Sequence, residues 1–524
     1  MTSTPSIPAL PLKFNVAGPC IPGEHYMLPP LDRLPGIVPL VETRNYFVLH
    51  SARQSGKTTT IQTLVDTINA KGTMCALYFS LESAQAFSDP GVGIPKIVQR
   101  IASGLRPHPI FGPILKTPDA EDAQLGVRDF LSFLAAHAPK PLAIFFDEVD
   151  ALSDGTLVTF LRELRDGYVS RRLAPFPASV ALVGMRNIRD YKAQIRPDSH
   201  TLGFASPFNI IAEALTLSTF SEADIRALYA QHTAATGQTF TPESVAAVYS
   251  LTRGQPWLVN ALARECVEKI HAFRYSEPIT ADDILAAKET LIRARGTHVD
   301  SLMERLKEPR VRRVVEPVIL GDSPTVSVND DDYRYVLDLG LLREERGTLL
   351  PANPMYGEII LRYLSNAEQK RFLVQYPTPF WLRPDNSLDM PLLMARFQDF
   401  WRENSESERA IYGYKESLPH LVLMAYLQRV VNGGGRIHRE MALGSGRLDL
   451  CVEFGPYRYA VELKMKRSFR SPASLDQFAA YLDRLALPEG WMPVFDESPT
   501  TPWSEKIYTR TLTHQGKTLH LIGL

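Results

Sequence analysis

The hydrophobic and polar positions divide the chain into segments with different textures. Between residues 46 and 214, continuous apolar runs alternate with segments whose apolar residues recur at helical spacing. This alternation predicts a parallel sheet that helices cover on both faces. The predicted strands are 46–50, 74–81, 142–148 and 179–185, and the predicted helices are 58–72, 92–105 and 127–138.

Residues 1–45 are rich in proline and have little periodicity. Their aromatic and aliphatic side chains could dock on a core, so we expect an ordered N-terminal strap with short turns. A disordered tail is the alternative interpretation.

From residue 215 the apolar runs stop and the pattern becomes helical. Residues 215–290 predict a small lid, in which one helix begins at the capping residue Ser221 and ends at Gly237. Residues 291–367 predict helix, hairpin and helix, which is the outline of a winged-helix domain. Such a domain binds DNA or serves as a protein–protein adaptor, and the basic residues within 303–313 favour phosphate contacts slightly.

Residues 368–524 predict a mixed sheet with helices. A long apolar helix comes first, followed by three extended runs, a helix and closing strands, in the order α-β-β-β-α-β. These segments are 416–432, 436–443, 447–454, 457–465, 475–487, 491–496 and 519–524.

Length and composition limit the class of protein. At about 150 residues per domain, 524 residues make three or four domains, and 45% hydrophobic with 22% charged residues is typical of a globular protein. A net charge of −1 excludes a globally basic nucleic-acid binder but not a local basic patch. The sequence shows no long apolar run, no signal-peptide pattern and no paired cysteines, so we expect a cytoplasmic protein with no membrane partner.

Residues 51–58 carry the strongest N-terminal signal, Ser-Ala-Arg-Gln-Ser-Gly-Lys-Thr, between a predicted strand and a predicted helix. A phosphate chain needs converging backbone N–H groups, a glycine where no Cβ fits, a lysine for the outer phosphates and a hydroxyl for Mg²⁺. Ser51 stands where glycine is usual, which an ordinary backbone torsion would allow. The expected nucleotide-contacting residues are Gln54, Ser55, Gly56, Lys57, Thr58 and Thr59.

A second part of the same site lies at the end of the apolar strand 142–148, where Asp147 and Glu148 follow one another. A carboxylate at a strand tip can hold Mg²⁺ together with Thr58, and its neighbour can polarise the water that attacks the γ-phosphate. Asp147 is therefore expected to bind metal and nucleotide, and Glu148 to be catalytic.

Four segments resemble a group of bacterial AAA-like P-loop ATPases related to the archaeal ATPase and STAND branches. They are 50–60, 145–152, 203–210 and 252–263. The resemblance covers roughly residues 14–365 and implies ATP with Mg²⁺ as the ligand. It also implies that the turn at 254–256 opens a lid helix beside the nucleotide.

Further roles follow from this resemblance alone. Asn187, at the tip of the strand 179–185, matches the position of a γ-phosphate sensor, with Arg186 and Arg189 as competitors for that role. An arginine finger would act on a neighbouring subunit and so would require a homo-oligomer. Its candidates are Arg162, Arg165 and Arg171, each of which could instead be a surface ion-pair partner.

The C-terminal region carries a second constellation. Asp449 lies on one extended run, and Glu462 and Lys464 lie on the same face of the next run. Gln477 and Tyr481 lie four residues apart on one face of the following helix. Two carboxylates across a hairpin can hold a divalent metal, and the lysine can orient or activate the attacking water.

This constellation resembles the PD-(D/E)XK nuclease superfamily in its RecB-like branch, over about residues 370–524. The resemblance implies that Asp449 and Glu462 hold Mg²⁺ or Mn²⁺, and Glu416 is the natural match to a metal-binding glutamate on the preceding helix. The usual proline before the aspartate is absent. The catalytic residues that the resemblance implies are Asp449, Glu462, Lys464 and Gln477.

The sequence therefore predicts an α/β protein with a P-loop NTPase parallel sheet, a helical lid, a winged helix and a restriction-endonuclease-like C-terminal domain. The expected domains are a strap at 1–45, an ATPase core at 46–214, a lid at 215–290, a winged helix at 291–367 and a nuclease-like domain at 368–524.

The expected function is ATP binding or hydrolysis coupled to metal-dependent DNA cleavage, with defence against foreign nucleic acid as its setting. Lys466 and Arg467 beside the metal site motivate DNA as the substrate. One alternative is a STAND-type switch, in which ATP drives signalling or assembly and an inactive nuclease-like domain only binds. Another is a transposition or defence regulator that senses foreign nucleic acid.

Overall fold

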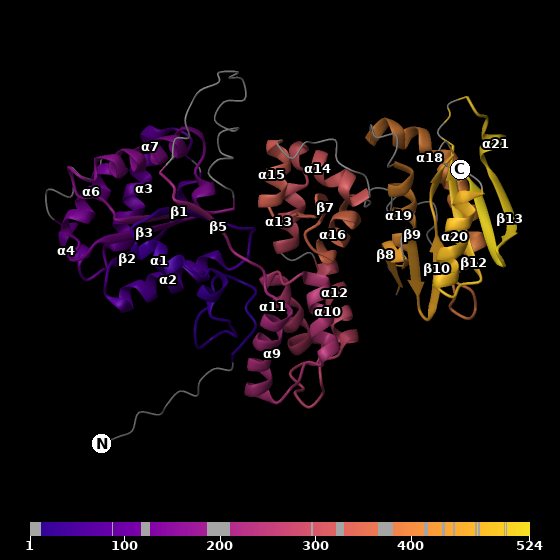
Figure 1. The fold of residues 1–524 in the computed structure, drawn as a ribbon, viewed down its shortest axis with the longest axis horizontal. Coiled ribbons are helices and arrows are strands. Elements are labelled where there is room, and N and C mark those ends of the chain that lie inside the picture. The colour runs from indigo at the N-terminus through magenta and orange to yellow at the C-terminus, as the bar shows by residue number, and fades with distance from the viewer. Residues whose placement is uncertain are drawn as a thin grey trace. The chain divides into compact units, whose positions relative to one another are not determined.

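The computed structural model describes most of the chain (Figure 1). The described residues are 12–85, 87–116, 126–185, 210–294, 297–320, 330–364, 381–412, 418–431, 435–443, 446–466, 469, 472–496, 498 and 500–524. Two predicted site residues, Asn187 and Glu416, lie outside them. The chain forms two compact units, the first from residues 1–314 and 325–356 and the second from residues 315–324 and 357–524.

The first unit contains a sheet of five parallel strands in the order β2-β3-β4-β1-β5. The strands are β1 (Tyr46–His50), β2 (Cys75–Ser80), β3 (Leu142–Asp147), β4 (Ser179–Gly184) and β5 (Glu213–Thr216). The first four confirm the apolar runs seen in the sequence. The pattern missed β5 because its side chains are mostly exposed, although its backbone pairs with β1 from Phe47 to His50.

Helices cover both faces of this sheet (Figure 1). Phe145 and Phe146 of β3 point to opposite faces, and each joins a separate buried core. The core on the Phe146 side takes side chains from α3 (Pro90–Leu105), α6 (Val127–His137) and α7 (Asp154–Ser170), and the core on the Phe145 side from α1 (Ile37–Glu42) and α2 (Lys57–Lys71).

A helical segment follows the sheet, as predicted. Its elements are α9 (Glu222–Thr236), α10 (Pro242–Thr252), α11 (Pro256–Arg264), a π-helical turn (Glu265–Ile270) and α12 (Ala281–Ala294). Ser221 caps α9 through a reciprocal pair of hydrogen bonds with Asp224, and Gly237 ends it in a left-handed conformation. After Arg264 the hydrogen bonding of α11 widens to the π type.

Gly254 sets the entry into α11. Its φ is +74°, and a Cβ added here would overlap the backbone oxygen of Phe220. The Gly254→Ala variant is therefore expected to lose about 2–4 kcal/mol of unfolding free energy, because backbone strain and a clash with rigid backbone add up. Urea unfolding of the full-length protein, followed by circular dichroism, measures the loss.

Gly237 offers a matched control for this substitution. Its φ is +82°, but nothing lies within 4 Å of an added Cβ. Gly237→Ala should therefore lose only the part of the unfolding free energy that comes from backbone strain, about 1 kcal/mol. Equal losses in the two variants would show that the close approach of Phe220 to Gly254 has no consequence.

The helix–hairpin–helix order predicted for residues 291–367 is present. Its elements are α13 (Thr297–Arg305), α14 (Pro309–Leu320), α15 (Asp331–Asp338), β6 (Leu342–Glu345), β7 (Thr348–Pro351) and α16 (Pro354–Leu364). Arg346 and Gly347 both have positive φ, at +52° and +78°, as a two-residue hairpin turn requires.

The basic residues that favoured phosphate contacts in this region take part in ion pairs. Arg305 Nη1 lies 2.7 Å from Glu308 Oε1, and Arg313 Nη2 lies 2.7 Å from Asp332 Oδ2. Arg310 Nε lies 3.2 Å from the same aspartate. These pairs weaken the expectation that the segment is a phosphate-binding surface.

The second unit contains a seven-stranded mixed sheet. Six strands follow the order β13-β14-β12-β10-β9-β8, and β11 pairs with β12 off this path. The strands are β8 (Gly435–Leu443), β9 (Gly446–Phe454), β10 (Tyr457–Val461), β11 (Lys464–Met465), β12 (Glu489–Phe495), β13 (Tyr508–His514) and β14 (Lys517–Gly523). The pattern missed β13 because it is an edge strand whose side chains are mostly exposed.

Helices also lie against this second sheet (Figure 1). They are α18 (Met390–Tyr412), α19 (Leu418–Val431), α20 (Ala473–Arg484) and the short α21 (Trp503–Lys506). Phe478 and Leu482 of α20 pack with Leu448 and Met492, while Phe397 of α18 contacts Phe495. Among the described residues, no helix has both the length and the apolar character needed to cross a membrane.

Candidate functional site

The loop at residues 51–56 joins β1 to α2 and has the backbone of a phosphate cradle. Gly56 precedes α2 with a φ of +96°, and Gln54 has a φ of +55°. The free N–H groups at the start of α2 form an anion-binding end. Ser51 does not have a positive φ, which explains how a serine replaces the usual glycine there.

Lys57 is buried under this loop. Its side chain is only 8% exposed, and its ammonium donates to the backbone oxygens of Ser51, over 2.8 Å, and of Ala52, over 2.9 Å. Burial lowers the pKa of Lys57, and Asp150 is the strongest of the carboxylates that oppose this shift. Within the described part of the chain, the buried Ser55 Oγ has no hydrogen-bond partner. A charged amine and an unsatisfied hydroxyl are therefore both placed to donate to an acceptor at the loop.

Asp147 lies at the tip of β3 opposite Thr58. Its Oδ2 accepts from Thr58 Oγ1 over 2.7 Å and from Tyr78 Oη over 3.0 Å, and its Oδ1 accepts from the backbone N–H of Glu148 over 2.9 Å. Glu148 has a left-handed backbone with a φ of +56°. Burial, with Asp147 as the second cause, raises the pKa of Glu148 above its usual range. The two halves of the predicted site therefore meet.

These residues fit Mg²⁺-ATP. Gly56 has the left-handed backbone of a phosphate-binding loop, with Arg33 Nη1 3.1 Å from where its Cβ would lie, Lys57 supplies positive charge, and the Ser55 hydroxyl can donate a hydrogen bond. The oxygens of Thr58 and Asp147 are already within hydrogen-bonding distance, and hydroxyl and carboxylate oxygens are the ligands that Mg²⁺ prefers.

The other two predicted loop residues contact neighbouring segments. Gln54 accepts, through its backbone oxygen, from the side chain of Gln255 at 3.4 Å, so the turn at 254–256 does lie against the loop. Thr59 Oγ1 accepts from the backbone N–H of Cys20 over 3.0 Å, and its hydroxyl is thereby engaged by the N-terminal segment.

The N-terminal segment connects the loop with the helices that follow the sheet. Arg33 Nη1 donates to Ser55 O over 2.8 Å, and Arg33 Nε donates to Ser218 O over 2.9 Å. Burial lowers the pKa of Arg33 to about 10. Trp257 Nε1 also donates to the backbone oxygen of Val16 over 2.8 Å. Arg33 is thus a half-buried cation beside the phosphate cradle.

Sequence reasoning missed three residues of this site: Arg33, Tyr78 and Asp150. Asp150 accepts from the backbone N–H of Met185, at the end of β4, and acts on the charge of Lys57. Asp150 follows the acidic strand tip by three residues and offered a weak signal. Arg33 and Tyr78 offered none, because only the folded chain brings them near the loop and Asp147.

The candidate sensor and finger residues are only partly described. Asn187, Arg186 and Arg189 lie outside the described residues. Arg171, one of the finger candidates, stacks on Tyr168 with 3.5 Å between its guanidinium carbon and the ring centre. Its ring contact fits the alternative interpretation of a side chain held within its own subunit.

The second constellation also comes together. Asp449 lies on β9, and Glu462 directly follows the antiparallel β10. The backbone N–H of Asp449 donates to Glu462 Oε2 over 3.2 Å, and the backbone N–H of Leu463 donates to Asp449 Oδ2 over 2.8 Å. Each carboxylate is therefore fixed by the backbone beside the other. Lys464 Nζ donates to Glu462 Oε1 over 2.8 Å.

The prediction of one continuous strand over 457–465 is wrong. β10 ends at Val461 and β11 begins at Lys464, although both pair in parallel with β12. The backbone N–H of Leu463 donates to a carboxylate and not to a strand, which interrupts the ladder at the site itself. Glu462 and Lys464 still lie on the same side, as their ion pair shows.

Glu462 is 2% exposed, and this burial dominates its electrostatics. Burial first, and the charge of Asp449 second, raise the pKa of Glu462 to about 7, while Lys464 opposes the shift. A buried carboxyl facing another carboxylate favours the arrival of a cation.

Gln477 and Tyr481 lie on α20, one turn apart. Gln477 Nε2 donates to Tyr481 Oη over 2.6 Å, and Tyr481 is buried in the core under the sheet. The hydrogen bond fixes the amide of an otherwise exposed glutamine.

The donor set fits a divalent metal with few protein ligands. Asp449 and Glu462 offer carboxylate oxygens, and Mg²⁺ commonly keeps several waters. In the described part of the chain, no group of three or more His, Cys, Asp or Glu residues gathers as a metal site. Glu416, the third predicted ligand, lies outside the described residues.

The similar solved structures cover about two thirds of the chain. It matches no protein family and no curated protein. Among solved structures, it is similar to a Walker-type ATPase of Pyrococcus abyssi, at 15% identity over 66% of this chain and 99% of that one, with a TM-score of 0.48. It is also similar to the RuvB Holliday junction branch migration motor of Thermotoga maritima, at 12% identity over 62% and 91%, with a TM-score of 0.33. A third similar structure is Cdc6p of Pyrobaculum aerophilum, at 16% identity over 64% and 93%, with a TM-score of 0.34.

The first unit itself defines its fold class. A five-stranded parallel sheet, a glycine-lysine-threonine loop between β1 and α2, and an acidic residue at the tip of β3 are the parts of a P-loop NTPase. The chain is an α/β protein with a P-loop NTPase fold in its first unit.

Proposed function

We propose that this protein is an ATPase coupled to a metal-dependent nuclease that acts on DNA. The observation that carries the proposal is the reciprocal holding of Asp449 and Glu462, with Lys464 bonded to the latter, in a chain that also has a phosphate-binding loop. Two sites with such different donor sets in one polypeptide favour a nucleotide that regulates a second reaction.

At the ATPase site, the loop binds the phosphates, and the residues at the strand tip act in metal binding and hydrolysis. Lys57 neutralises the outer phosphates, and Thr58 with Asp147 holds Mg²⁺, which would stabilise charge on the phosphates during transfer. Glu148 is the candidate for polarising the attacking water. Burial and Asp147 raise its pKa, which makes its carboxylate a stronger proton acceptor than that of an exposed glutamate, and Lys57 opposes this rise.

At the nuclease site, the chain places two carboxylates and one amine. Asp449 and Glu462 would hold a divalent metal, which supplies Lewis-acid stabilisation of a phosphate under attack. Lys464, fixed by Glu462, is positioned to orient the attacking water. Gln477 is the proposed fourth catalytic residue, with its amide oriented by Tyr481.

DNA is the proposed substrate because a basic segment follows the site. Lys466 is 58% exposed in its side chain and pairs over 2.8 Å with Asp496, which is only 8% exposed, so the ammonium is open to solvent and could also contact a phosphate. Arg467 belongs to the same segment and lies outside the described residues. Changing both to alanine should remove salt-sensitive DNA binding near the site. A role in defence against foreign DNA belongs to the same proposal and rests only on the pairing of the two activities.

The test is a cleavage assay with the full-length protein. Circular DNA, linear DNA and RNA are incubated with Mg²⁺ or Mn²⁺, with and without ATP. Metal-dependent cleavage of DNA whose rate changes with ATP would support the proposal. If no substrate is cleaved while ATP is still bound, the proposal of a nuclease fails.

One observation favours a second candidate, an ATP-driven STAND-type switch with an inactive nuclease-like domain. The basic residues of the predicted winged helix are engaged in ion pairs, which suits a protein–protein adaptor better than a phosphate-binding surface. A switch would keep ATP binding and would lose nothing when Asp449 or Glu462 is changed to alanine.

A further inference from the structure

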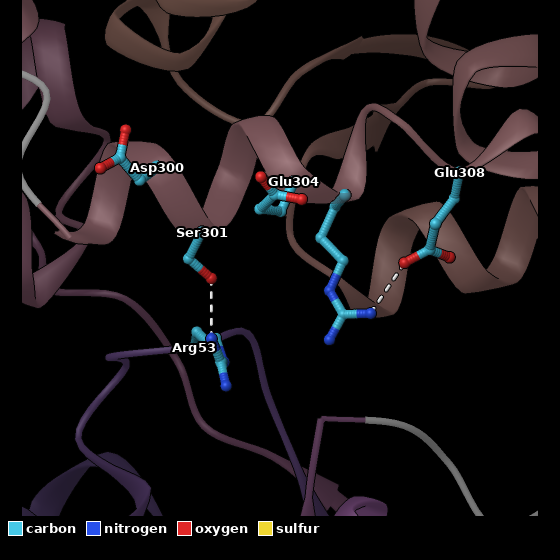
Figure 2. A pocket seen from close by; sticks show the side chains of 6 residues that line it. Arg53, Asp300, Ser301, Glu304 and Glu308 are labelled. Carbon is cyan, nitrogen blue, oxygen red and sulfur yellow. Dashed lines mark hydrogen bonds and ion pairs between the residues drawn. The ribbon is translucent and has the colours of Figure 1, made fainter.

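Within the first unit, residues of α13 and of the end of α15 lie directly on the phosphate-binding loop. Arg53, the third residue of the loop pattern, donates from Nη1 to Ser301 Oγ of α13 over 2.7 Å, as Figure 2 shows. Gly340, which follows α15, approaches Ala52 so closely that an added Cβ would overlap the alanine methyl group. One further contact is the ion pair between His50 and Asp338, at 3.7 Å.

Arg53 reaches Ser301 across a cavity of about 510 Å³ between the loop and α13. The cavity gives the arginine room to change its direction. Arg305 also lines the cavity, and its Nη1 donates to Glu308 Oε1 over 2.7 Å. The lining residues are Arg53, Asp300, Ser301, Glu304, Arg305 and Glu308.

The charge of Arg53 acts on the nucleotide site. Burial is the main cause that lowers the pKa of Lys57, and Arg53 lowers it further. Burial raises the pKa of Glu148, and Arg53 is among the groups that oppose this rise. The guanidinium is therefore electrostatically close both to the ammonium that would bind the outer phosphates and to the proposed catalytic carboxylate.

The bond to Ser301 is the weaker of two that Arg53 can make. A guanidinium bonded to a neutral hydroxyl gains less than one bonded to an anionic phosphate, which also offers bidentate geometry. An additional negative charge near Lys57 would therefore draw Arg53 from the hydroxyl. ADP lacks the terminal phosphate of ATP, so it does not extend this negative charge as far along the loop.

We propose that Arg53 is the residue that distinguishes ATP from ADP, and that it exchanges Ser301 for the terminal phosphate when ATP binds. The inference rests on the proposed ATP binding and adds a regulatory step to it. When Arg53 leaves Ser301, α13 loses a contact with the loop. The binding of ATP is thereby transmitted to α13 and the helices that follow it.

The test compares ATP and ADP affinities by titration of fluorescent nucleotides, with Mg²⁺, into the full-length protein. Arg53→Ala should weaken ATP binding by about 10-fold and change ADP binding by less than about 3-fold, since one charge-assisted bond is lost only for ATP. Ser301→Ala should strengthen ATP binding by about 2–5-fold, because the competing neutral hydrogen bond is gone. The double variant should behave like Arg53→Ala alone.

Arg305→Ala is the matched control. It removes another arginine that lines the same cavity, and this arginine is bonded to Glu308 instead of Ser301. It should leave the ratio of the two affinities unchanged. An unchanged ratio in Arg53→Ala, with both nucleotides still bound, would overturn the inference and leave the ATPase proposal standing. If the wild-type protein binds neither nucleotide, the ATPase proposal itself fails.

A second readout follows α13 directly. Hydrogen exchange of the amides in residues 297–305 should speed up in wild-type protein on adding ATP and not on adding ADP. In Ser301→Ala, exchange should be faster already without nucleotide. If the amides of residues 297–305 exchange hydrogen at the same rate in wild-type protein without nucleotide, with ADP and with ATP, the proposed move of Arg53 from Ser301 to the phosphate is contradicted.

Discussion

Replacing Lys57 with alanine is expected to weaken ATP binding by about 100-fold or more, because a buried charge–phosphate contact is lost. Lys57 is the buried cation of the loop and donates to the backbone oxygens of Ser51 and Ala52. The substitution removes positive charge and also the bonds that curve the loop around a phosphate. Isothermal titration calorimetry with Mg²⁺-ATP measures the effect.

Lys71→Ala provides the matched control, since Lys71 ends the same helix and is 46% exposed beside Glu42. Its ATP affinity should equal that of the wild type.

Thr58→Ala adds a variant that leaves the loop amine in place and removes a hydroxyl bonded to Asp147. This variant should retain ATP binding in the absence of Mg²⁺ and lose most of the gain that Mg²⁺ gives. Unaltered ATP binding in Lys57→Ala, with an unchanged melting curve, would disprove the assignment of the loop.

The second large effect is expected at the other site. Asp449→Asn should lower the rate of metal-dependent DNA cleavage by about 1,000-fold or more, because an anionic ligand to the metal disappears. The asparagine oxygen can still accept from the backbone N–H of Leu463, so the local fold should persist. Gel-based cleavage of circular DNA with Mg²⁺ or Mn²⁺ measures the rate.

Glu453→Gln is the control on the same strand. Glu453 pairs with His438 and Arg458, away from the carboxylate pair, and its loss should change cleavage little. Equal cleavage by wild type and Asp449→Asn would show that the activity does not come from this site. A wild-type protein that binds ATP and cleaves nothing would support the switch with an inactive nuclease-like domain.

The pH dependence of cleavage follows from Glu462. Because burial and Asp449 raise its pKa to about 7, this carboxyl is mostly protonated below that pH and must lose the proton before it can hold a metal. Cleavage at subsaturating Mg²⁺ should therefore fall about tenfold per pH unit below pH 7 and level off above about pH 8. A rate that is constant from pH 5.5 to 8 would contradict Glu462 as a ligand.

The sequence by itself determined the local elements and the motifs. Continuous apolar runs predicted β1 to β4 because both faces of a covered parallel sheet are buried, and Ser221 and Gly237 marked the ends of α9 because capping is a local interaction. The one-residue spacing of Glu462 and Lys464 indicated that they lie on the same side of the chain, which their ion pair confirms although the expected strand is interrupted there.

Only the tertiary structure decided which distant groups meet. The contacts of Arg33 with Ser55, of Tyr78 with Asp147 and of Arg53 with Ser301 join a motif residue to a distant residue that no motif marks. Edge and exposed strands such as β5 and β13 escape the apolar pattern because most of their side chains are exposed and backbone pairing places them in the sheet. The break between β10 and β11 has the same origin, because a backbone N–H bonds to a side chain that lies on another strand.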